Sequence, residues 1–318
     1  MENLRPKVSI IGCGNVGMRY AYALMIQGIA RQIVLVDMDR KRLEGEVMDL
    51  SHGVPYVPAV DIAEGDYPDI KNSDLVVVTA GRKQVPGQSR MALVRNNVEL
   101  FGKMMPQITK YAPDAILLVA TNPVDVLAYT AYKISGKPAN QVMSSGTVLD
   151  TARFRLLLSK RCGVDPHNIH AYILGEHGDS EFAVWSKANI GGVLFREYCP
   201  TCVNNTICNG EFDFKMIFEE VKDSAYRIIE KKGETSYGIG LALARITQAI
   251  LADEDAILPV SSLVENYLGV SDVFLSLPAI VNKSGIKGVL RLELDPEEQA
   301  AFKNSAEAVK RVIKDSGL

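Results

Sequence analysis

The sequence lacks long apolar runs, an excess of basic residues and low-complexity tracts, and each absence excludes a class of protein. The longest apolar runs, such as residues 115–120, span about six residues, whereas a membrane-spanning helix needs about 18. Lys and Arg total 35 against 38 for Asp and Glu, which is too little positive charge for a general nucleic-acid-binding protein. Hydrophobic residues make up 47% of the 318 residues, so we expect a full core.

Cysteine is also scarce. Five cysteines, an odd number in a chain of this size, favour reduced thiols over a disulfide framework. No signal peptide fits the N-terminus, which passes from polar residues directly into an apolar strand, so we expect a cytoplasmic protein. Cys199, Cys202 and Cys208 lack a fourth ligand and a nearby histidine. They are interpreted as reduced thiols of a surface loop, and no metal site is predicted.

The first half of the sequence alternates short runs of branched aliphatic residues with longer helical patterns. The aliphatic runs, predicted as buried strands, cover residues 8–11, 33–37, 75–80 and 116–120. Helical patterns between them include residues 16–29 and 40–52. Continuous apolar strands separated by helices indicate an α/β fold with a doubly wound parallel sheet.

The pattern changes near Ser145, which predicts one domain over residues 1–145 and a second, mixed α+β domain over residues 146–318. No Pro/Ser-rich linker separates them, so we expect the two to share an interface. In the second domain, the helical pattern of residues 214–252 predicts one long helix, kinked at Gly233.

A C-terminal helix that docks on the rest of the fold is predicted after Asp295. This residue can cap the helix, Pro296 suits the first helical position, and Glu298 completes a capping box. The apolar stripe that follows consists of Phe302, Ala306, Val309 and Ile313.

A glycine-rich turn follows the first predicted strand and opens a predicted helix. Gly12 would permit the tight turn, Gly14 would let the main chain approach a pyrophosphate, and Gly17 would let helix and strand pack closely. Asp37 ends the next strand, 20 residues after Gly17, where it would bind the ribose hydroxyls. This arrangement predicts a dinucleotide-binding Rossmann domain.

The acidic side chain of Asp37 would repel a 2′-phosphate and therefore favours NAD over NADP. Arg40, Lys41 and Arg42 lie close in sequence and keep NADP open as an alternative. We interpret these three residues as a solvated helix face.

Four further motifs accompany the glycine-rich turn. They are a polar loop at residues 84–90, Thr121-Asn122-Pro123-Val124-Asp125 after a strand, Asp150-Thr151-Ala152-Arg153 at a helix start, and Gly175-Glu176-His177-Gly178-Asp179 in a turn. In this order the motifs closely resemble the L-lactate/malate dehydrogenase superfamily, over essentially the whole chain. The resemblance implies hydride transfer between NAD(H) and a 2-hydroxy acid, in a homotetramer. It also implies that Val16, Arg42, Gly81, Asn122 and Ser145 contact the cofactor.

The resemblance assigns the acid–base chemistry to two residues and substrate binding to a third. His177 matches the family's catalytic histidine, and an unperturbed pKa of about 6.5 suits a proton donor to a developing alkoxide. Asp150 matches the carboxylate that orients the imidazole. Arg153, three residues further along the same helix face, matches the arginine that binds the substrate carboxylate at two points. A local ion pair between Asp150 and Arg153 is compatible with these roles.

Three more residues match substrate-contacting positions of the family. Arg90 matches an arginine that polarises the substrate carbonyl from a mobile loop, which would exclude water on closing. Asn122 matches a side chain that hydrogen-bonds the substrate oxygen. Thr235 matches a threonine that lines the pocket, although a hydroxyl at a helix start is an alternative interpretation.

The choice of substrate depends on the position six residues before Arg90, which is Gln84. Malate enzymes carry arginine there, whereas a neutral glutamine favours pyruvate and L-lactate, because a second carboxylate would be buried unpaired. A loop shifted by two residues would instead present Arg82, so malate dehydrogenase remains an alternative. A non-catalytic NADH-binding protein is a second alternative, against which the intact acid–base set argues.

A regulatory site is also implied. Arg155 lies two residues after Arg153, about 200° around the helix, and therefore faces away from the substrate. Arg155 and His170 match the pair that binds fructose 1,6-bisphosphate where two subunits meet in allosteric bacterial members of the superfamily. An interface ion pair or a surface arginine is the alternative. We expect the bisphosphate to lower the apparent requirement for pyruvate.

Overall fold

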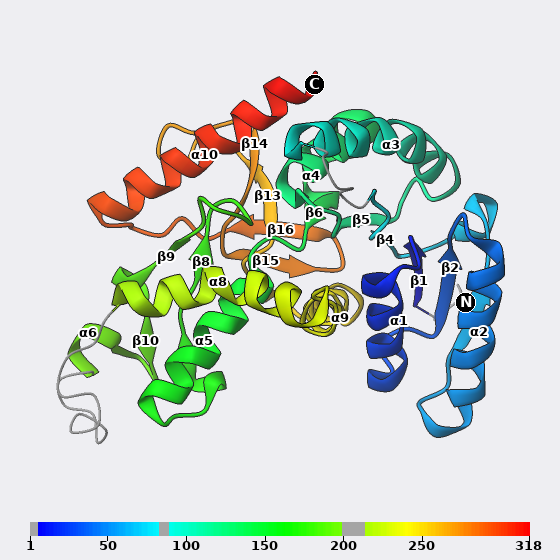
Figure 1. Cartoon of the computed structure of the whole chain (residues 1–318), viewed down its shortest axis with the longest axis horizontal. Helices are drawn as coiled ribbons and strands as arrows, with labels where there is room; N and C mark the ends of the chain where they lie inside the picture. The colour runs from blue at the N-terminus through cyan, green and yellow to red at the C-terminus, as the bar shows by residue number, and fades with distance from the viewer. Residues whose placement is uncertain (1–5, 83–88, 199–213) are drawn as a thin grey trace.

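An eight-stranded sheet forms the centre of the molecule (Figure 1). The computed structural model describes residues 6–82, 89–198 and 214–318; the side chain of Arg90 also lies outside this description. Six strands are parallel and stand in the order 3-2-1-4-5-6, which is the order of a doubly wound Rossmann sheet. They are β1 (Lys7–Ile11), β2 (Gln32–Val36), β3 (Asp61–Glu64), β4 (Leu75–Val78), β5 (Ile116–Val119) and β6 (Val142–Ser144). The predicted fold class is confirmed.

Two strands from the second half of the chain extend this sheet. β13 (Ser261–Val264) pairs with β6, and β14 (Val273–Ser276) pairs with β13, both in the antiparallel sense. The residues downstream of Ser145 therefore complete the sheet that the upstream residues begin. The two halves of the chain share a hydrogen-bonded interface because one sheet runs through both.

Each face of the sheet is covered by helices. Along β4, Val76 and Val78 belong to one apolar core and Leu75 and Val77 to another, because successive side chains of a strand point to opposite faces. The first core includes residues of α3 (Arg90–Tyr111), α4 (Val124–Ser135) and α10 (Pro296–Ser316). The second includes residues of α1 (Asn15–Gln27), α2 (Arg40–Gly53) and α9 (Tyr237–Leu251).

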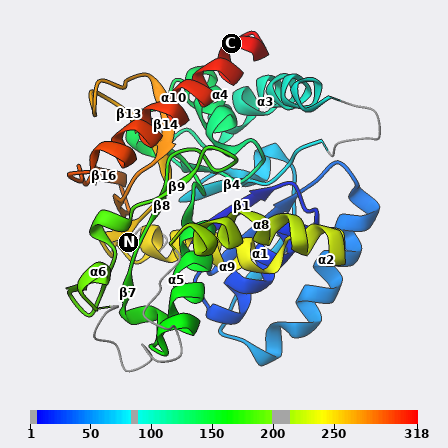
Figure 2. The same cartoon turned by 60° about the vertical axis from the view of Figure 1, so that its left-hand side comes forward.

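The second half is a mixture of helices and short antiparallel strands, as predicted (Figure 2). Its own core, which includes Phe154 and Phe195, lies between α5 (Val148–Cys162) and α8 (Phe214–Lys232). The smaller elements are β7 (Ile169–His170), β8 (Ile173–Leu174), β9 (Phe182–Ala183), β10 (Asn189–Ile190), β11 (Val193–Leu194), α6 (Phe195–Tyr198), β12 (Ala256–Leu258), β15 (Ala279–Asn282) and β16 (Gly285–Val289). Short 3₁₀ segments lie at Val54–Tyr56, Tyr67–Ile70, Ala139–Gln141, Pro166–Asn168 and Trp185–Lys187. Across the three described ranges, no helix is long and apolar enough to cross a bilayer.

The expectation of one kinked helix over residues 214–252 is wrong. Gly233 adopts φ +88°, a left-handed conformation that favours glycine, and it separates α8 from α9. The link between the two helices brings Glu234 against the glycine-rich turn, where its carboxylate accepts a hydrogen bond from the Asn15 amide. A break in the helix thus places residues 233–236 next to the predicted cofactor site.

The C-terminal helix α10 begins as the sequence predicts. The Asp295 carboxylate accepts the Glu298 N–H at 2.9 Å, and the Glu298 carboxylate accepts the Asp295 N–H at 3.1 Å. The predicted apolar stripe is buried, and Phe302 and Val309 are fully inaccessible. The helix lies across the top of the molecule in Figure 1, against α3, α4 and β14.

We predict that Asp295→Ala lowers the free energy of unfolding by about 1 kcal/mol, because the first turn of α10 loses its side-chain acceptor. Denaturant unfolding measures this change. The matched control is Asp315→Ala at the other end of the same helix, where a carboxylate opposes the helix dipole. A loss of stability in the control as large as in Asp295→Ala would contradict the capping argument.

Candidate active site

The predicted cofactor residues meet at one edge of the sheet. Gly12 follows β1, Asp37 follows β2, Gly81 lies just beyond β4, Asn122 lies just beyond β5, and Ser145 follows β6. All five therefore stand at the carboxyl ends of parallel strands, where doubly wound sheets bind their ligands. The sheet therefore brings together residues that lie far apart in the sequence.

The glycine-rich turn fits a bound dinucleotide. Gly12 adopts φ +103°, and a Cβ on it would collide with the main chain of Ala80. A Cβ on Gly17 would collide with the carbonyl oxygen of Gly12. By contrast, a Cβ on Gly14 would meet no atom within 4 Å, so the space in front of the α1 N-terminus is open to an anionic group. Val16 lies half-buried in the first turn of that helix.

Asp37 joins the ends of β1 and β2. Its carboxylate accepts the Cys13 N–H at 2.6 Å and the Asp39 N–H at 3.0 Å, which fixes the carboxylate beside the glycine-rich turn. The neighbouring cations have other partners: Arg42 pairs with Glu46 at 3.2 Å and Arg40 pairs with Asp66 at 2.8 Å. These ion pairs support the interpretation of residues 40–42 as a solvated helix face.

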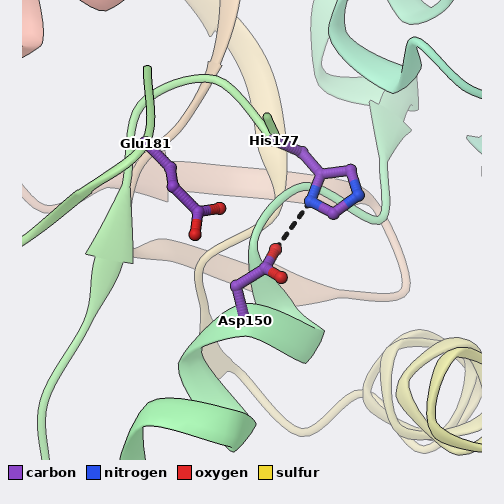
Figure 3. A group of neighbouring side chains, drawn as sticks. All are labelled: Asp150, His177 and Glu181. Carbon is purple, nitrogen blue, oxygen red and sulfur yellow. Dashed lines mark hydrogen bonds and ion pairs between the residues drawn. The ribbon is translucent and has the colours of Figure 1, made fainter. Parts of the chain in front are cut away.

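The proposed acid–base residues are in direct contact (Figure 3). The Nδ1 atom of His177 lies 2.6 Å from Oδ2 of Asp150, and the Arg153 guanidinium donates to Oδ1 of Asp150 at 2.8 Å. The Asp150 side chain is only 4% exposed, whereas that of His177 is 26% exposed. The carboxylate therefore holds one ring nitrogen of His177 and leaves Nε2 available to a substrate.

Two neighbouring backbone segments fix this pair in place. Ser276 of β14 forms reciprocal main-chain hydrogen bonds with Gly175, at 2.8 and 3.1 Å, and so anchors the turn that carries His177. The Ser276 hydroxyl also accepts the Thr147 N–H at 3.1 Å, at the start of α5, whose first turn carries Asp150. One residue of the central sheet thus positions both members of the pair.

Electrostatics favour the charged form of both groups. Burial opposes protonation of His177, but the charge and hydrogen bond of Asp150, with the charges of Glu181 and Asp125, raise its pKa to about 9. Burial also opposes ionisation of Asp150, yet the cationic His177 and Arg153 hold the pKa of this carboxyl below its usual value. At neutral pH, His177 is therefore a protonated imidazole that can donate a proton.

Two carboxyl groups beside His177 had no role in the sequence analysis. Glu181 is 7% exposed and lies close to the pair in Figure 3; burial and the charge of Asp150 raise its pKa. Asp125 is 2% exposed, and its Oδ2 atom accepts the main-chain N–H of His177 at 2.8 Å. Both residues lie inside or next to the motifs above, but only the fold reveals that they are buried beside the imidazole.

Asp150, His177 and Glu181 also offer ligand atoms within 4.8 Å of one another, a spacing that a metal ion could use. Both oxygens of Asp150 already accept hydrogen bonds, one of them from a cationic guanidinium. Since this proximity follows from the Asp150–His177 contact, we attribute the cluster to acid–base chemistry.

The residues predicted to contact the substrate lie on three different segments. Asn122 is exposed at the end of β5, and Thr235 lies in the link between α8 and α9. The cap residue of α9 is Ser236, so Thr235 is not the helix-start hydroxyl of the alternative interpretation. Arg90 is the first residue of α3. The part of the chain that is described does not include Gln84, the side chain of Arg90, or the three cysteines Cys199, Cys202 and Cys208.

The two proposed regulatory residues lie on neighbouring elements, Arg155 on α5 and His170 on β7. Arg155 donates to the carbonyl oxygen of Ala171 at 3.0 Å, and its guanidinium stands 5.2 Å from the ring centroid of Tyr172. His170, the residue before Ala171, is exposed on β7. The structure therefore brings Arg155 next to the strand that carries His170.

Comparison with known proteins matches both halves of the chain to one family. The lactate/malate dehydrogenase NAD-binding domain model matches residues 6–144, and the α/β C-terminal domain model of the same family matches residues 147–317. L-lactate dehydrogenases of Thermoanaerobacter sp. (strain X514) and Clostridium botulinum (strain Hall) are each 49% identical. The first covers 97% of this chain and 98% of its own length, the second 96% of each.

The similar solved structures are also lactate dehydrogenases. A lactate dehydrogenase from a Medee basin deep-sea metagenome library superposes with a TM-score of 0.94 at 42% identity, covering 99% of this chain and 100% of its own. The minor L-lactate dehydrogenase of Enterococcus mundtii, in a ligand-bound form, gives 0.92 at 37% identity, covering 98% of each chain.

The fold and site define an NAD-dependent 2-hydroxyacid oxidoreductase, with NAD as its cofactor. The chain belongs to the lactate/malate dehydrogenase family.

We predict that Asp150→Asn lowers kcat/KM for reduction of the 2-oxo acid by about 10²-fold, because the imidazole loses the group that orients and charges it. With His177 assigned as the proton donor, we expect the wild-type rate to fall as pH rises through about 9. Without the carboxylate the pKa of His177 drops, and the fall moves to lower pH. The pH profile of kcat/KM measures this shift.

The matched control is Asp165→Asn. Asp165 also contacts a histidine, His167, at 2.7 Å, but this pair is exposed on the surface. The control should leave the rate and the pH profile unchanged. An unchanged profile in Asp150→Asn would contradict the assignment of His177 as the titrating acid.

Proposed function

We propose that the enzyme is an L-lactate dehydrogenase, which reduces pyruvate to L-lactate with NADH and catalyses the reverse reaction. The observation that carries the proposal is the buried Asp150, which contacts His177 and Arg153 at 2.6 and 2.8 Å beside the carboxyl edge of the sheet. These two cations are the groups that a 2-oxo acid requires, one for its carbonyl oxygen and one for its carboxylate. The relatives at 49% identity, which are L-lactate dehydrogenases, support the same activity.

The chain's own residues orient the substrate and supply the proton. Arg153 has further N–H groups beyond the one bonded to Asp150, and these would bind the pyruvate carboxylate. His177 would donate its Nε2 proton to the carbonyl oxygen while Asp150 stabilises the charged ring. When bound at the glycine-rich turn, NADH supplies the hydride to the carbonyl carbon.

Three other residues would complete the pocket. Asn122 would hydrogen-bond the substrate oxygen from the end of β5, and Thr235 would line the pocket from the link between α8 and α9. Arg90, at the start of α3, would polarise the carbonyl when the preceding loop closes. We propose that this closure also brings Gln84 onto the methyl group of pyruvate.

The preference for pyruvate over oxaloacetate is assigned to Gln84. A neutral side chain leaves no partner for a second carboxylate, whose burial would be unfavourable. The competing candidate is malate dehydrogenase, in which Arg82 would pair with the second carboxylate. It is exposed at the start of the same loop, and its main-chain N–H is bound to Asn97 at 2.8 Å.

We predict that the wild-type enzyme prefers pyruvate and that Gln84→Arg raises kcat/KM for oxaloacetate relative to pyruvate by about 10²-fold. Initial rates of NADH oxidation with both substrates measure the ratio. Gln88→Arg adds the same charge to the same loop and serves as the control, with no such switch. A wild-type preference for oxaloacetate would mean that Arg82 contacts the substrate and that the enzyme is a malate dehydrogenase.

We also propose that fructose 1,6-bisphosphate activates the enzyme through Arg155 and His170. The guanidinium of Arg155 lies against Ala171 and Tyr172, directly after His170, so the two side chains would contribute to one effector site. Where two subunits meet, two such pairs would converge on the phosphate groups of one effector.

We predict that the bisphosphate lowers the pyruvate concentration at half-maximal rate by about fivefold or more. The double variant Arg155→Ala with His170→Ala should abolish the effect and keep the rate at saturating pyruvate. His167→Ala, which removes another exposed histidine, is the control and should retain activation. Activation that survives the double variant would exclude this site.

A homotetramer in the cytoplasm is part of the proposal. Tyr22 and Ile26 of α1 and Tyr237 and Leu241 of α9 are about half exposed or more, on two helices that pack side by side. Exposed apolar side chains on adjacent elements favour a subunit interface, which sedimentation equilibrium would test. The buried thiol of Cys13 fits a reducing compartment.

A further inference from the structure

A buried carboxylate connects the cofactor-binding half of the chain to the catalytic turn. Asp125 lies in the first turn of α4, directly after the segment that carries Asn122, and is 2% exposed. Its Oδ2 atom accepts the main-chain N–H of His177 at 2.8 Å. The two residues belong to regions matched by two separate domain models, so this hydrogen bond crosses from one domain to the other.

No arginine or lysine among the described residues forms an ion pair with Asp125. Its Oδ1 atom is buried and has no hydrogen-bond partner within the same residues. A buried carboxylate is unfavourable unless nearby groups stabilise its charge. Four features do so here: the neighbouring Ser261 hydroxyl, the N-terminus of α4, the N–H of His177, and the positive charge of the His177 ring.

The charge of Asp125 is therefore linked to that of His177. Burial raises the pKa of Asp125 to about 6, although the neighbouring Ser261 hydroxyl and His177 oppose the rise, so the group is ionised at neutral pH. Glu176, in the same turn as His177, also faces Asp125 and raises its pKa. Ionised Asp125 in turn favours the protonated form of the imidazole.

The other charges around His177 leave Asp125 a separate role. Asp150 contacts the ring, but its negative charge is shared with Arg153. Glu181 lies beside Asp150 and has a raised pKa, so it carries less of its charge at neutral pH. Asp150 determines how the ring is oriented, whereas Asp125 determines where the main chain of His177 lies relative to Asn122.

We propose that Asp125 is a positioning residue for the hydride-transfer reaction. It holds the main chain of His177 at a fixed place relative to Asn122 and the cofactor-binding edge, and its charge adds to that of Asp150 in favouring the protonated imidazole. The inference rests on the proposed role of His177 as the acid. It assigns to one side chain a role in both the location and the charge of the proton donor.

Two substitutions separate these functions. Asp125→Asn keeps an oxygen that can accept the His177 N–H but removes the charge, whereas Asp125→Ala removes both. We expect Asp125→Asn to retain kcat within about threefold at pH 6 and to move the alkaline fall of kcat/KM down by about half a pH unit or more. We expect Asp125→Ala to lower kcat by about 10- to 100-fold with KM for pyruvate changed much less.

The matched control is Glu298→Gln. Glu298 is also a buried carboxylate in the first helical turn of its element, and it also accepts a main-chain N–H from another segment, that of Ser186, at 2.9 Å. None of its hydrogen bonds involves a site residue. The control should lower stability without moving the pH profile. NADH binding, followed by fluorescence, reports whether each variant retains its fold.

The outcomes are distinct. If Asp125→Asn has the wild-type pH profile, or if Glu298→Gln shows the same shift, the inference is wrong. If Asp125→Ala does not fold, the pH profile of kcat/KM in Asp125→Asn still tests the inference. If the wild-type enzyme reduces oxaloacetate and not pyruvate, the proposed substrate is wrong, and the same variants measured with oxaloacetate test Asp125 independently.

Discussion

The contact between the Asp150 carboxylate and the His177 imidazole constrains the rest of the structure. A carboxylate that is 4% exposed needs groups that stabilise its charge, and the fold provides two cations, His177 and Arg153. To bring these groups together, α5 must begin next to the turn of residues 175–179. Ser276 of β14 bonds to both segments and fixes that distance.

The shared sheet explains how two halves of the chain form one site. β13 and β14 come from downstream of Ser145, yet they extend the sheet whose carboxyl edge forms the cofactor site. The turn that carries His177 is therefore attached to the same sheet as the glycine-rich turn. The hydrogen bond from His177 to Asp125 adds a further connection between the halves, at the proposed proton donor.

The charges around His177 favour the protonated form of its imidazole. Three carboxyl groups, Asp150, Asp125 and Glu181, surround a single imidazole and raise its pKa to about 9. Burial opposes ionisation of Asp150, but the cations His177 and Arg153 outweigh it and hold the pKa of this carboxyl below its usual value. A proton donor of this kind remains charged at neutral pH and can give up its proton when negative charge develops on a substrate oxygen.

The sequence by itself determined the strands, the glycine-rich turn and the α10 cap, because these depend on local periodicity and short motifs. It also indicated the family, through the motifs that contain His177, Asp150 and Arg153. It failed for residues 214–252, where the left-handed Gly233 interrupts a helical pattern, since a glycine's φ depends on what surrounds it. Only the tertiary structure decided that Asp125 and Glu181 are buried beside the imidazole. Burial and the charges of distant neighbours set those roles, and both arise from strands and helices far apart in the chain.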